Sequence, residues 1–341
     1  MDFKVLLPSG VSLPRECIEA AGNDELIAGI LYRRGIDKPE KIEAFLYEDK
    51  YRPFNPSEFE NVKEAIKLIL SSANQDAKVC IYGDYDVDGI TSSVLLVEAL
   101  EPLVGNVIYH IPHRFTEGYG MDIDVVRELG DRDVDLIVTC DCGISNVDEI
   151  ELARNLGMDV IVTDHHTPPE ILPPANVILN PKLYGADHPL YPLPGVGVAY
   201  ILVRALYEKL DRPLPEGRWL DLVALGIIAD VVPVLGECRY LLRKGLPCLL
   251  NPERVGLRAL YRVLSSSGCK VEDEEDIAFQ VSPRINAAGR MDSPYLPAEL
   301  LLEKDMDRAL DMAADLDSLN RERKALQNQI FDRAVEMVEA E

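Results

Sequence analysis

The chain has 341 residues, of which 47% are hydrophobic and 28% charged, as is usual for folded globular proteins. This balance excludes a disordered, collagen-like or coiled-coil chain, and the length corresponds to roughly two domains. The longest apolar stretch, residues 219–236, is interrupted by Asp221 and Asp230, so we expect no membrane-spanning segment and no membrane partner. The N-terminus lacks a secretory signal, and seven scattered cysteines without a CxxC pair indicate a cytoplasmic protein.

The chain is strongly acidic. Thirty-five basic and fifty-nine acidic side chains give a formal net charge of −24. Such a chain repels a polyanion at long range, which disfavours a role in coating DNA. The simplest role of the acidic surface is to keep the protein in solution. An enzyme that acts on nucleic acid remains compatible with this charge if a local basic groove or a further domain supplies the attraction.

The hydrophobic pattern changes along the first half of the chain. Residues 1–74 predict a mostly helical N-terminal region, with helices at 39–46 and 61–71. From residue 77, short β-rich runs alternate with helical segments. The expected strands are 78–82, 106–111, 135–140, 159–163 and 176–179, and the expected helices between them are 90–100, 122–129 and 146–156. This alternation predicts an α/β fold with a parallel sheet flanked by helices.

The second half predicts helices at 198–210 and 219–228 after a proline-rich loop at 181–195. Segment 239–300 has a mixed pattern, and its acidic run Glu272–Asp276 is expected to be a solvated loop. Residues 306–341 contain no Gly or Pro and predict one long helix, which we interpret as a connector to a domain that the chain lacks. The predicted division is a helical N-terminal region at 1–74, a metal-binding core at 75–240, a completing segment at 241–304 and a connector helix at 305–341.

An acidic loop directly follows the first strand. Asp84, Asp86 and Asp88 alternate within Gly83–Gly89, and carboxylates this close repel one another unless a cation offsets the repulsion. Ligands of open α/β sheets bind at the carboxyl ends of the strands. An EF-hand is excluded, because Leu95 replaces its bidentate glutamate and a strand precedes the loop. A solvated acidic turn without metal is the plain alternative.

Three further sites place metal-ligand residue types after predicted strands or in an apolar run. Asp141 ends the strand at 135–140, His165 and His166 follow the strand at 159–163, and Asp230 is the only charge in 224–233. Because neighbouring residues of a regular strand face opposite sides, we expect one imidazole to bind metal and the other to face the substrate.

The donor set selects the metal. Carboxylates and imidazole without a thiolate set suit Mn²⁺ or Mg²⁺, and so many carboxylates imply two ions about 3.5–4 Å apart. Zinc held by Cys140 and Cys142 is disfavoured because no second cysteine pair exists. The chain also lacks a P-loop, a dinucleotide-binding glycine motif and the nucleophile elbow of a serine hydrolase.

These acidic and histidine motifs occur in a fixed order with other segments: Leu31–Ile36, Ile111–Arg114, Glu117–Gly120, Asn180–Lys182, Gly195–Ala199 and Pro283–Arg290. The ordered set resembles the DHH phosphoesterase superfamily and, within it, the RecJ-like exonucleases of single-stranded DNA. The resemblance extends from Leu31 to the last helix. It implies a DHH phosphoesterase-like α/β fold and a two-metal 5′→3′ exonuclease of DNA repair and recombination that uses Mn²⁺, with Mg²⁺ as the alternative.

The resemblance also implies roles for individual residues. One metal site is expected to consist of Asp88, Asp141, His165 and Asp230, and the other of Asp84, Asp86 and a bridging Asp141. The resemblance assigns His166, the second catalytic residue beside Asp141, to the scissile phosphate. It assigns Arg114 to the 5′ end of the strand and Arg290 to a phosphate. Guanidinium groups suit both arginine roles because they bind phosphate oxygens bidentately.

The chain departs from the family pattern in two places. Tyr82 stands where many members of the superfamily have a metal-binding histidine, and the glycine-rich C-terminal domain is absent. Two alternatives therefore stay open. One is a small-substrate phosphoesterase acting on oligoribonucleotides or cyclic dinucleotides. The other is a RecJ-related subunit that binds a replisome partner. Single-stranded RNA is a further alternative substrate.

Overall fold

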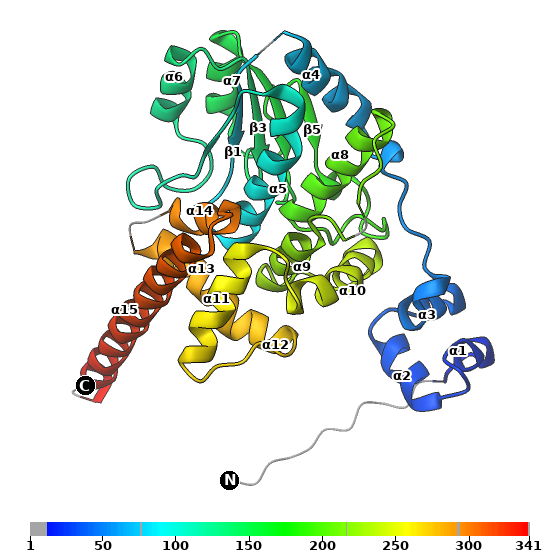
Figure 1. The fold of residues 1–341 in the computed structure, drawn as a ribbon. Helices are drawn as coiled ribbons and strands as arrows, with labels where there is room; N and C mark the ends of the chain where they lie inside the picture. The colour runs from blue at the N-terminus through cyan, green and yellow to red at the C-terminus, as the bar shows by residue number, and fades with distance from the viewer. Residues whose placement is uncertain (1–11, 76, 216, 292–293, 340–341) are drawn as a thin grey trace. The chain divides into compact units, whose positions relative to one another are not determined.

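The computed structural model describes residues 12–75, 77–215, 217–291 and 294–339 (Figure 1). It divides the chain into two compact units, Met1–Phe54 and Asn55–Glu341. The first unit contains helices α1 (Arg15–Ala20), α2 (Glu25–Arg33) and α3 (Pro39–Leu46) and the 3₁₀ turn η1 (Glu48–Lys50). Its core is formed by buried side chains that include Cys17, Ala28, Leu31 and Ile42. The finer division of the chain that the sequence predicts remains a prediction.

The second unit is built on a sheet of five parallel strands. These are β1 (Val79–Tyr82), β2 (Val107–His110), β3 (Leu136–Cys140), β4 (Asp159–Thr163) and β5 (Val177–Leu179), and their order in the sheet is β2-β1-β3-β4-β5. The predicted α/β fold with a parallel sheet flanked by helices is confirmed. Short apolar strands of this kind are typical of a sheet that is buried on both faces.

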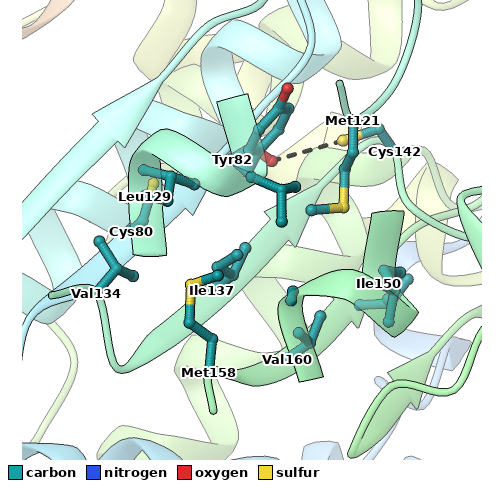
Figure 2. Packing of buried hydrophobic residues seen from close by; sticks show 13 residues of the cluster. Cys80, Tyr82, Met121, Leu129, Val134, Ile137, Cys142, Ile150, Met158 and Val160 are labelled. Atoms are coloured by element: carbon teal, nitrogen blue, oxygen red, sulfur yellow. Dashed lines mark hydrogen bonds between the residues drawn. The ribbon is translucent and has the colours of Figure 1, made fainter. Parts of the chain in front are cut away.

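Two layers of helices cover the sheet. Helices α4 (Val62–Asn74), α5 (Val87–Val104) and α8 (Gly195–Lys209) pack on one face, and α6 (Ile123–Asp131) and α7 (Val147–Asn155) pack on the other (Figure 1). Figure 2 shows the second interface, where alternate strand residues such as Cys80, Ile137 and Val160 meet Leu129 and Ile150. The strand register aligns the first three of these residues across β1, β3 and β4, so they lie on one face.

The strand order places a switch point between β1 and β3. The chain leaves β1 for α5 on one face and leaves β3 for α7 on the other. The loops after these two strands therefore lead to opposite faces of the sheet, and ligands of open α/β sheets bind at such a point, beyond the carboxyl ends of the strands.

The rest of the second unit is helical. It comprises α9 (Leu220–Ala229), α10 (Gly236–Leu250), α11 (Val255–Ser266), α12 (Glu274–Asp276), the π-helix η4 (Ile277–Val281), α13 (Ser282–Arg290), α14 (Leu296–Leu302) and α15 (Met306–Glu339), with 3₁₀ turns η2 (Pro56–Glu58) and η3 (Pro181–Leu183). The predicted long helix is confirmed through Glu339, and residues 340–341 lie outside the described residues.

Two expectations for this region are corrected. Segment 239–300 is largely helical rather than mixed, and the acidic run is a solvated loop only at Glu272 and Asp273, because Glu274–Asp276 form helix α12. Asp273 accepts a hydrogen bond from the backbone N–H of Asp276 at 3.0 Å and so caps the short helix α12. Carboxylates are favoured in the first turn of a helix because they face its positive dipole end, so the run marks a helix start.

A buried ionic cluster ties α5 to α9 and α11. Arg254 donates to both oxygens of Glu98 at 3.0 and 3.2 Å and to Asp221 at 2.8 Å. Burial alone would raise the pKa of Glu98, but the hydrogen bonds and charges of Arg254 and Lys304 lower it to about 2. This cluster fixes the relative position of the two helices that carry Asp88 and Asp230.

The structure contains no disulfide bond between its cysteines, and its described helices include no candidate membrane span. All seven cysteines are free. Among the residues described, we find no helix with the length and hydropathy that a bilayer crossing requires.

Candidate metal centre

The six predicted metal ligands come together at the carboxyl edge of the sheet. Three triplets of side chains have ligand atoms within 4.8 Å of one another: Asp84 with Asp86 and Asp141; Asp88 with His165 and Asp230; and Asp141 with His165 and His166. The ligands come from the β1–α5 loop, the first turn of α5, the residues after β3 and β4, and the residue that ends α9. The first triplet has the members that the resemblance implies for one site, and the second has three of the four that it implies for the other, all but Asp141.

The metal loop, which we define as Gly83–Gly89, is held in shape by close backbone packing. Asp86 caps α5 by accepting the Gly89 N–H at 3.0 Å. A Cβ atom at Gly89 would lie 2.6 Å from the Asp84 backbone nitrogen, so only glycine permits this turn. The two constraints bring Asp84 and Asp86 to the same side of the loop.

Asp141 sits at the centre of the cluster in a rarely used backbone conformation. Its φ is +61°, a left-handed value that asparagine and aspartate tolerate better than most residues. Its side chain is 2% exposed. Across from it, a Cβ at Gly195 would lie 2.7 Å from the Asp141 Cβ, so the start of α8 packs directly on this residue.

Asp88 is anchored by the N-terminus of α8. Its carboxylate accepts the backbone N–H groups of Gly195 at 2.5 Å and Val196 at 2.9 Å. Because α8 begins at Gly195 rather than at the predicted Val198, these N–H groups belong to its first turn, which favours a negative charge. The sequence analysis did not predict these hydrogen bonds to Asp88, although Gly195 and Gly197 could have indicated a close approach of the backbone.

His165 faces the carboxylates. Its Nε2 lies 3.0 Å from Asp141, 3.6 Å from Asp230 and 3.7 Å from Asp88. Burial lowers the pKa of His165 to about 4, so at neutral pH the ring is uncharged and offers the lone pair that a metal ion needs.

His166 points outward and is oriented by Asp164. Its Nδ1 lies 2.8 Å from the Asp164 carboxylate, and its side chain is 44% exposed. This hydrogen bond raises the pKa of His166. The expectation that one imidazole binds metal and the other faces the substrate stays a prediction, because Nδ1 of His166 also lies 3.9 Å from Asp141. The reasoning behind that expectation was wrong. Both histidines lie beyond the end of β4, so strand alternation does not separate them. Instead, Asp164 accepts both of their backbone N–H groups, which shapes the turn.

The cluster is electrostatically strained without a cation. Burial, followed by the charge of Asp86, raises the pKa of Asp84 to about 7, and burial raises the pKa of Asp230 to about 6. Burial and then neighbouring carboxylates also raise the pKa values of Asp88 and Asp141. A positive charge among these groups would remove the repulsion.

Unpaired polar atoms point to the same conclusion. Asp84 Oδ1, Asp141 Oδ1 and His165 Nε2 are buried and make no well-oriented hydrogen bond to the residues that the structure describes, although the last two atoms lie 3.0 Å apart. Buried polar atoms without partners are rare in native proteins. The three atoms belong to the two ligand triplets, and oxygen with imidazole nitrogen is a donor set that suits Mn²⁺. The residues present therefore fit a divalent cation.

One of the two predicted arginines, Arg114, lies against an aromatic side chain of the acidic loop. Arg114 and Arg290 are exposed, and the Arg114 guanidinium carbon lies 5.2 Å from the ring centroid of Tyr85, within the metal loop. Burial and Asp84 raise the pKa of Tyr85, and the charges of both arginines oppose this shift. The Arg114 guanidinium thus lies beside the acidic cluster, and the charge of Arg290 also acts on Tyr85.

Tyr119 was also missed in the sequence. Its hydroxyl lies 3.1 Å from Nε2 of His166, and it is placed between Gly118 and Gly120, both of which have positive φ. The motif at residues 117–120 could have indicated a functional role for Tyr119. The motif alone does not show that the tyrosine hydroxyl contacts His166.

The comparisons with known proteins identify the family and the fold. Residues 78–227 match the model of the DHH family, N-terminal domain. The chain is 36% identical to a crystal structure of exonuclease RecJ bound to manganese, with a TM-score of 0.75 over 82% of this chain and 71% of that one. The chain belongs to the RecJ family. A second RecJ structure, from Thermus thermophilus and in complex with Mn²⁺, has a TM-score of 0.79 at 32% identity and covers 95% of this chain and 46% of that one.

Curated RecJ relatives are longer than this chain. The single-stranded-DNA-specific exonuclease RecJ of Bacillus subtilis is 40% identical over 92% of this chain and 39% of its own length. The RecJ of Escherichia coli is 37% identical over 82% of this chain and 50% of its own length. The chain thus spans about two fifths to one half of these two curated RecJ proteins.

Proposed function

We propose that this chain is the catalytic core of a metal-dependent exonuclease that degrades single-stranded DNA from the 5′ end, in DNA repair and recombination. The observation that carries the proposal is the convergence of five carboxylates and one imidazole at the switch point of a parallel sheet. Relatives named single-stranded-DNA-specific exonuclease support the substrate, and a relative bound to manganese supports the metal.

In the proposed site, Asp84, Asp86 and Asp141 hold one divalent cation, and Asp88, His165 and Asp230, with Asp141 between the two sites, hold a second. Mn²⁺ is the proposed ion, with Mg²⁺ as the alternative. Such a pair supplies charge stabilisation to the phosphoryl oxygens and lowers the pKa of an attacking water.

The chain's own residues orient the substrate. His166 is exposed and held by Asp164 through Nδ1, and its Nε2, which lies 3.1 Å from the Tyr119 hydroxyl, is the nitrogen proposed to face a phosphate oxygen together with that phenol. Because the carboxylate raises the pKa of His166, the ring carries more positive charge at neutral pH and donates a hydrogen bond to the developing charge. Asp141 keeps both proposed sites together.

A direct assay tests the function. Single-stranded DNA, single-stranded RNA and duplex DNA of one sequence, labelled at either end, are incubated with the chain and Mn²⁺, Mg²⁺ or a chelator. We expect release of 5′-labelled nucleotide from single-stranded DNA with Mn²⁺ and no release with the chelator. Equal digestion of duplex DNA, preferential digestion of RNA or undiminished digestion with the chelator would contradict the proposal.

Arg114 is proposed to bind the 5′ phosphate. We expect Arg114→Ala to raise the KM about tenfold for 5′-phosphorylated strands and far less for 5′-hydroxyl strands, because one charge-assisted hydrogen bond contributes ~1.5–3 kcal/mol. Steady-state kinetics on the two substrates measure the difference. Arg127→Ala, at an exposed arginine on α6, is the control for the loss of one positive charge. Equal KM increases on both substrates would remove Arg114 from end recognition.

A further inference from the structure

Helix α13 lies between the metal loop and the long helix α15. Its residues form the segment Pro283–Arg290, of which only Arg290 has been given a role above. Three other residues of the helix make contacts that reach far along the chain: Asn286, Gly289 and Arg284.

The Asn286 side chain bonds to the metal loop. Its Oδ1 accepts the backbone N–H of Val87 at 3.1 Å, a contact between residues 199 positions apart. Val87 is the first residue of α5 and lies between Asp86 and Asp88. The first N–H groups of a helix have no acceptor within the helix, so Asn286 supplies one at the point where the loop becomes helix.

Gly289 brings α13 against the same loop. A Cβ atom at this position would lie 2.9 Å from the carbonyl oxygen of Tyr85 and 3.2 Å from its Cβ. Glycine is therefore needed for helix and loop to approach this closely. Together, Asn286 and Gly289 contact the loop on both sides of Asp86.

The opposite side of α13 is anchored. Arg284 is 6% exposed at its side chain and donates to Asp317 of α15 at 2.9 Å and to the carbonyl oxygen of Gln280 at 2.6 Å. The π-helix η4 directly precedes α13, and the Ser282 hydroxyl bonds to the Ile277 carbonyl at 3.0 Å. Such π-turns shift the register of the following helix, so they help determine which face of α13 meets the loop.

We propose that Asn286 is a positioning residue for the metal site formed by Asp84, Asp86 and Asp141. The inference rests on the proposed function, because it assumes that this triplet binds a divalent cation. The effect is selective. The Asp88 carboxylate has its own anchor in the N–H groups of Gly195 and Val196, whereas among the described residues the Asp86 carboxylate is hydrogen-bonded within the loop, to the N–H of Gly89.

A calorimetric titration of the full chain with Mn²⁺, which measures each binding step separately, tests the proposal. We expect Asn286→Ala to weaken one Mn²⁺ binding step at least about tenfold, the usual cost of losing a residue that orients metal ligands, and to leave the other step unchanged. Asp84→Asn identifies the step that belongs to the Asp84 site. Excess Mn²⁺ should restore the hydrolysis rate of Asn286→Ala but not that of Asp84→Asn.

The matched control is Asn176→Ala. Asn176 also accepts a backbone N–H with its side-chain oxygen, from Val160 at 2.7 Å, but at the amino end of β4. The Asn176→Ala variant should have a lower melting temperature than the wild type, as Asn286→Ala should, but its Mn²⁺ affinity should be unchanged. If Asn286→Ala does not fold, Gly289→Ala provides the second variant, because its added methyl group displaces the loop without removing the hydrogen bond.

The outcomes separate the two proposals. Failure of the wild-type chain to bind Mn²⁺ overturns the proposed metal site and this inference with it. Only the inference is overturned if the wild type binds Mn²⁺ and hydrolyses DNA but Asn286→Ala has the same Mn²⁺ affinities. Where Asn286→Ala does not fold, unchanged affinities in Gly289→Ala have the same meaning. Equal weakening of both steps, or equal weakening in Asn176→Ala, also overturns the inference, because the effect would then be one of general stability.

Discussion

Asp141→Asn is expected to abolish hydrolysis while making the metal-free protein more stable. Asp141 joins the two candidate metal sites, so its neutralisation weakens both, and losing about 4 kcal/mol of transition-state stabilisation lowers the rate about a thousandfold. In the absence of metal the same change removes one of several mutually repelling buried carboxylates. Asparagine is chosen rather than alanine because the φ of +61° is strained for alanine.

Single-turnover kinetics and thermal unfolding in chelator measure the two effects. Asp135→Asn, at the exposed start of β3, is the control because it removes the same charge at the opposite edge of the sheet. Its rate and its metal-free melting temperature should stay close to those of the wild type. A metal-free Asp141→Asn protein that melts below the wild type would show that the carboxylate supports the fold rather than straining it.

Asp84→Asn is expected to stabilise the metal-free protein increasingly as pH rises. Folding raises the pKa of Asp84 from 3.8 to about 7 through burial and the charge of Asp86. A group with a raised pKa contributes stability that is fully present below pH 3.8 and is lost as pH rises to about 7. That loss amounts to about 4 kcal/mol, and the asparagine variant does not suffer it.

The measurement compares urea unfolding of Asp84→Asn and the wild type from pH 4 to pH 8. The comparison cancels His165, whose pKa folding lowers and whose contribution therefore grows with pH. In chelator the difference in unfolding free energy should be near zero at pH 4 and largest above pH 7. With saturating Mn²⁺ at pH 8 the order should reverse, because the wild type alone keeps a complete site. A pH-independent difference would contradict the raised pKa.

The sequence predicted the parts of the site that follow from strand ends. Asp84, Asp141 and His165 each come directly after an apolar strand, and parallel strands bring their carboxyl ends to one edge. Asp230 followed from a different signal, a lone charge in an apolar run. The alternation of strands and helices likewise predicted the parallel sheet. The hydrophobic period of each strand or helix can be recognised from neighbouring residues alone, without knowledge of distant contacts.

The sequence did not predict contacts that join distant segments. The Val87 N–H finds Asn286 199 positions away, and Asp88 finds Gly195 107 positions away. No local period signals either contact. The prediction for segment 239–300 was wrong for a related reason. The π-helix Ile277–Val281 interrupts the 3.6-residue period, so the helices around it do not form one continuous apolar stripe. The role of Asp164 was hidden because its partners are its own neighbours in the turn.

The candidate ligands extend along the chain from Asp84 to Asp230, and this spread has a consequence for folding on the ribosome. At the ordinary pace of synthesis, on the order of ten seconds separate the emergence of these two residues. The three carboxylates of the proposed Asp84, Asp86 and Asp141 site are present once β1 and β3 have paired, whereas the other proposed site also needs β4 and α9. A growing chain would therefore carry all the carboxylates of the first proposed site well before the ligands of the second, and the contacts from α13 would come last.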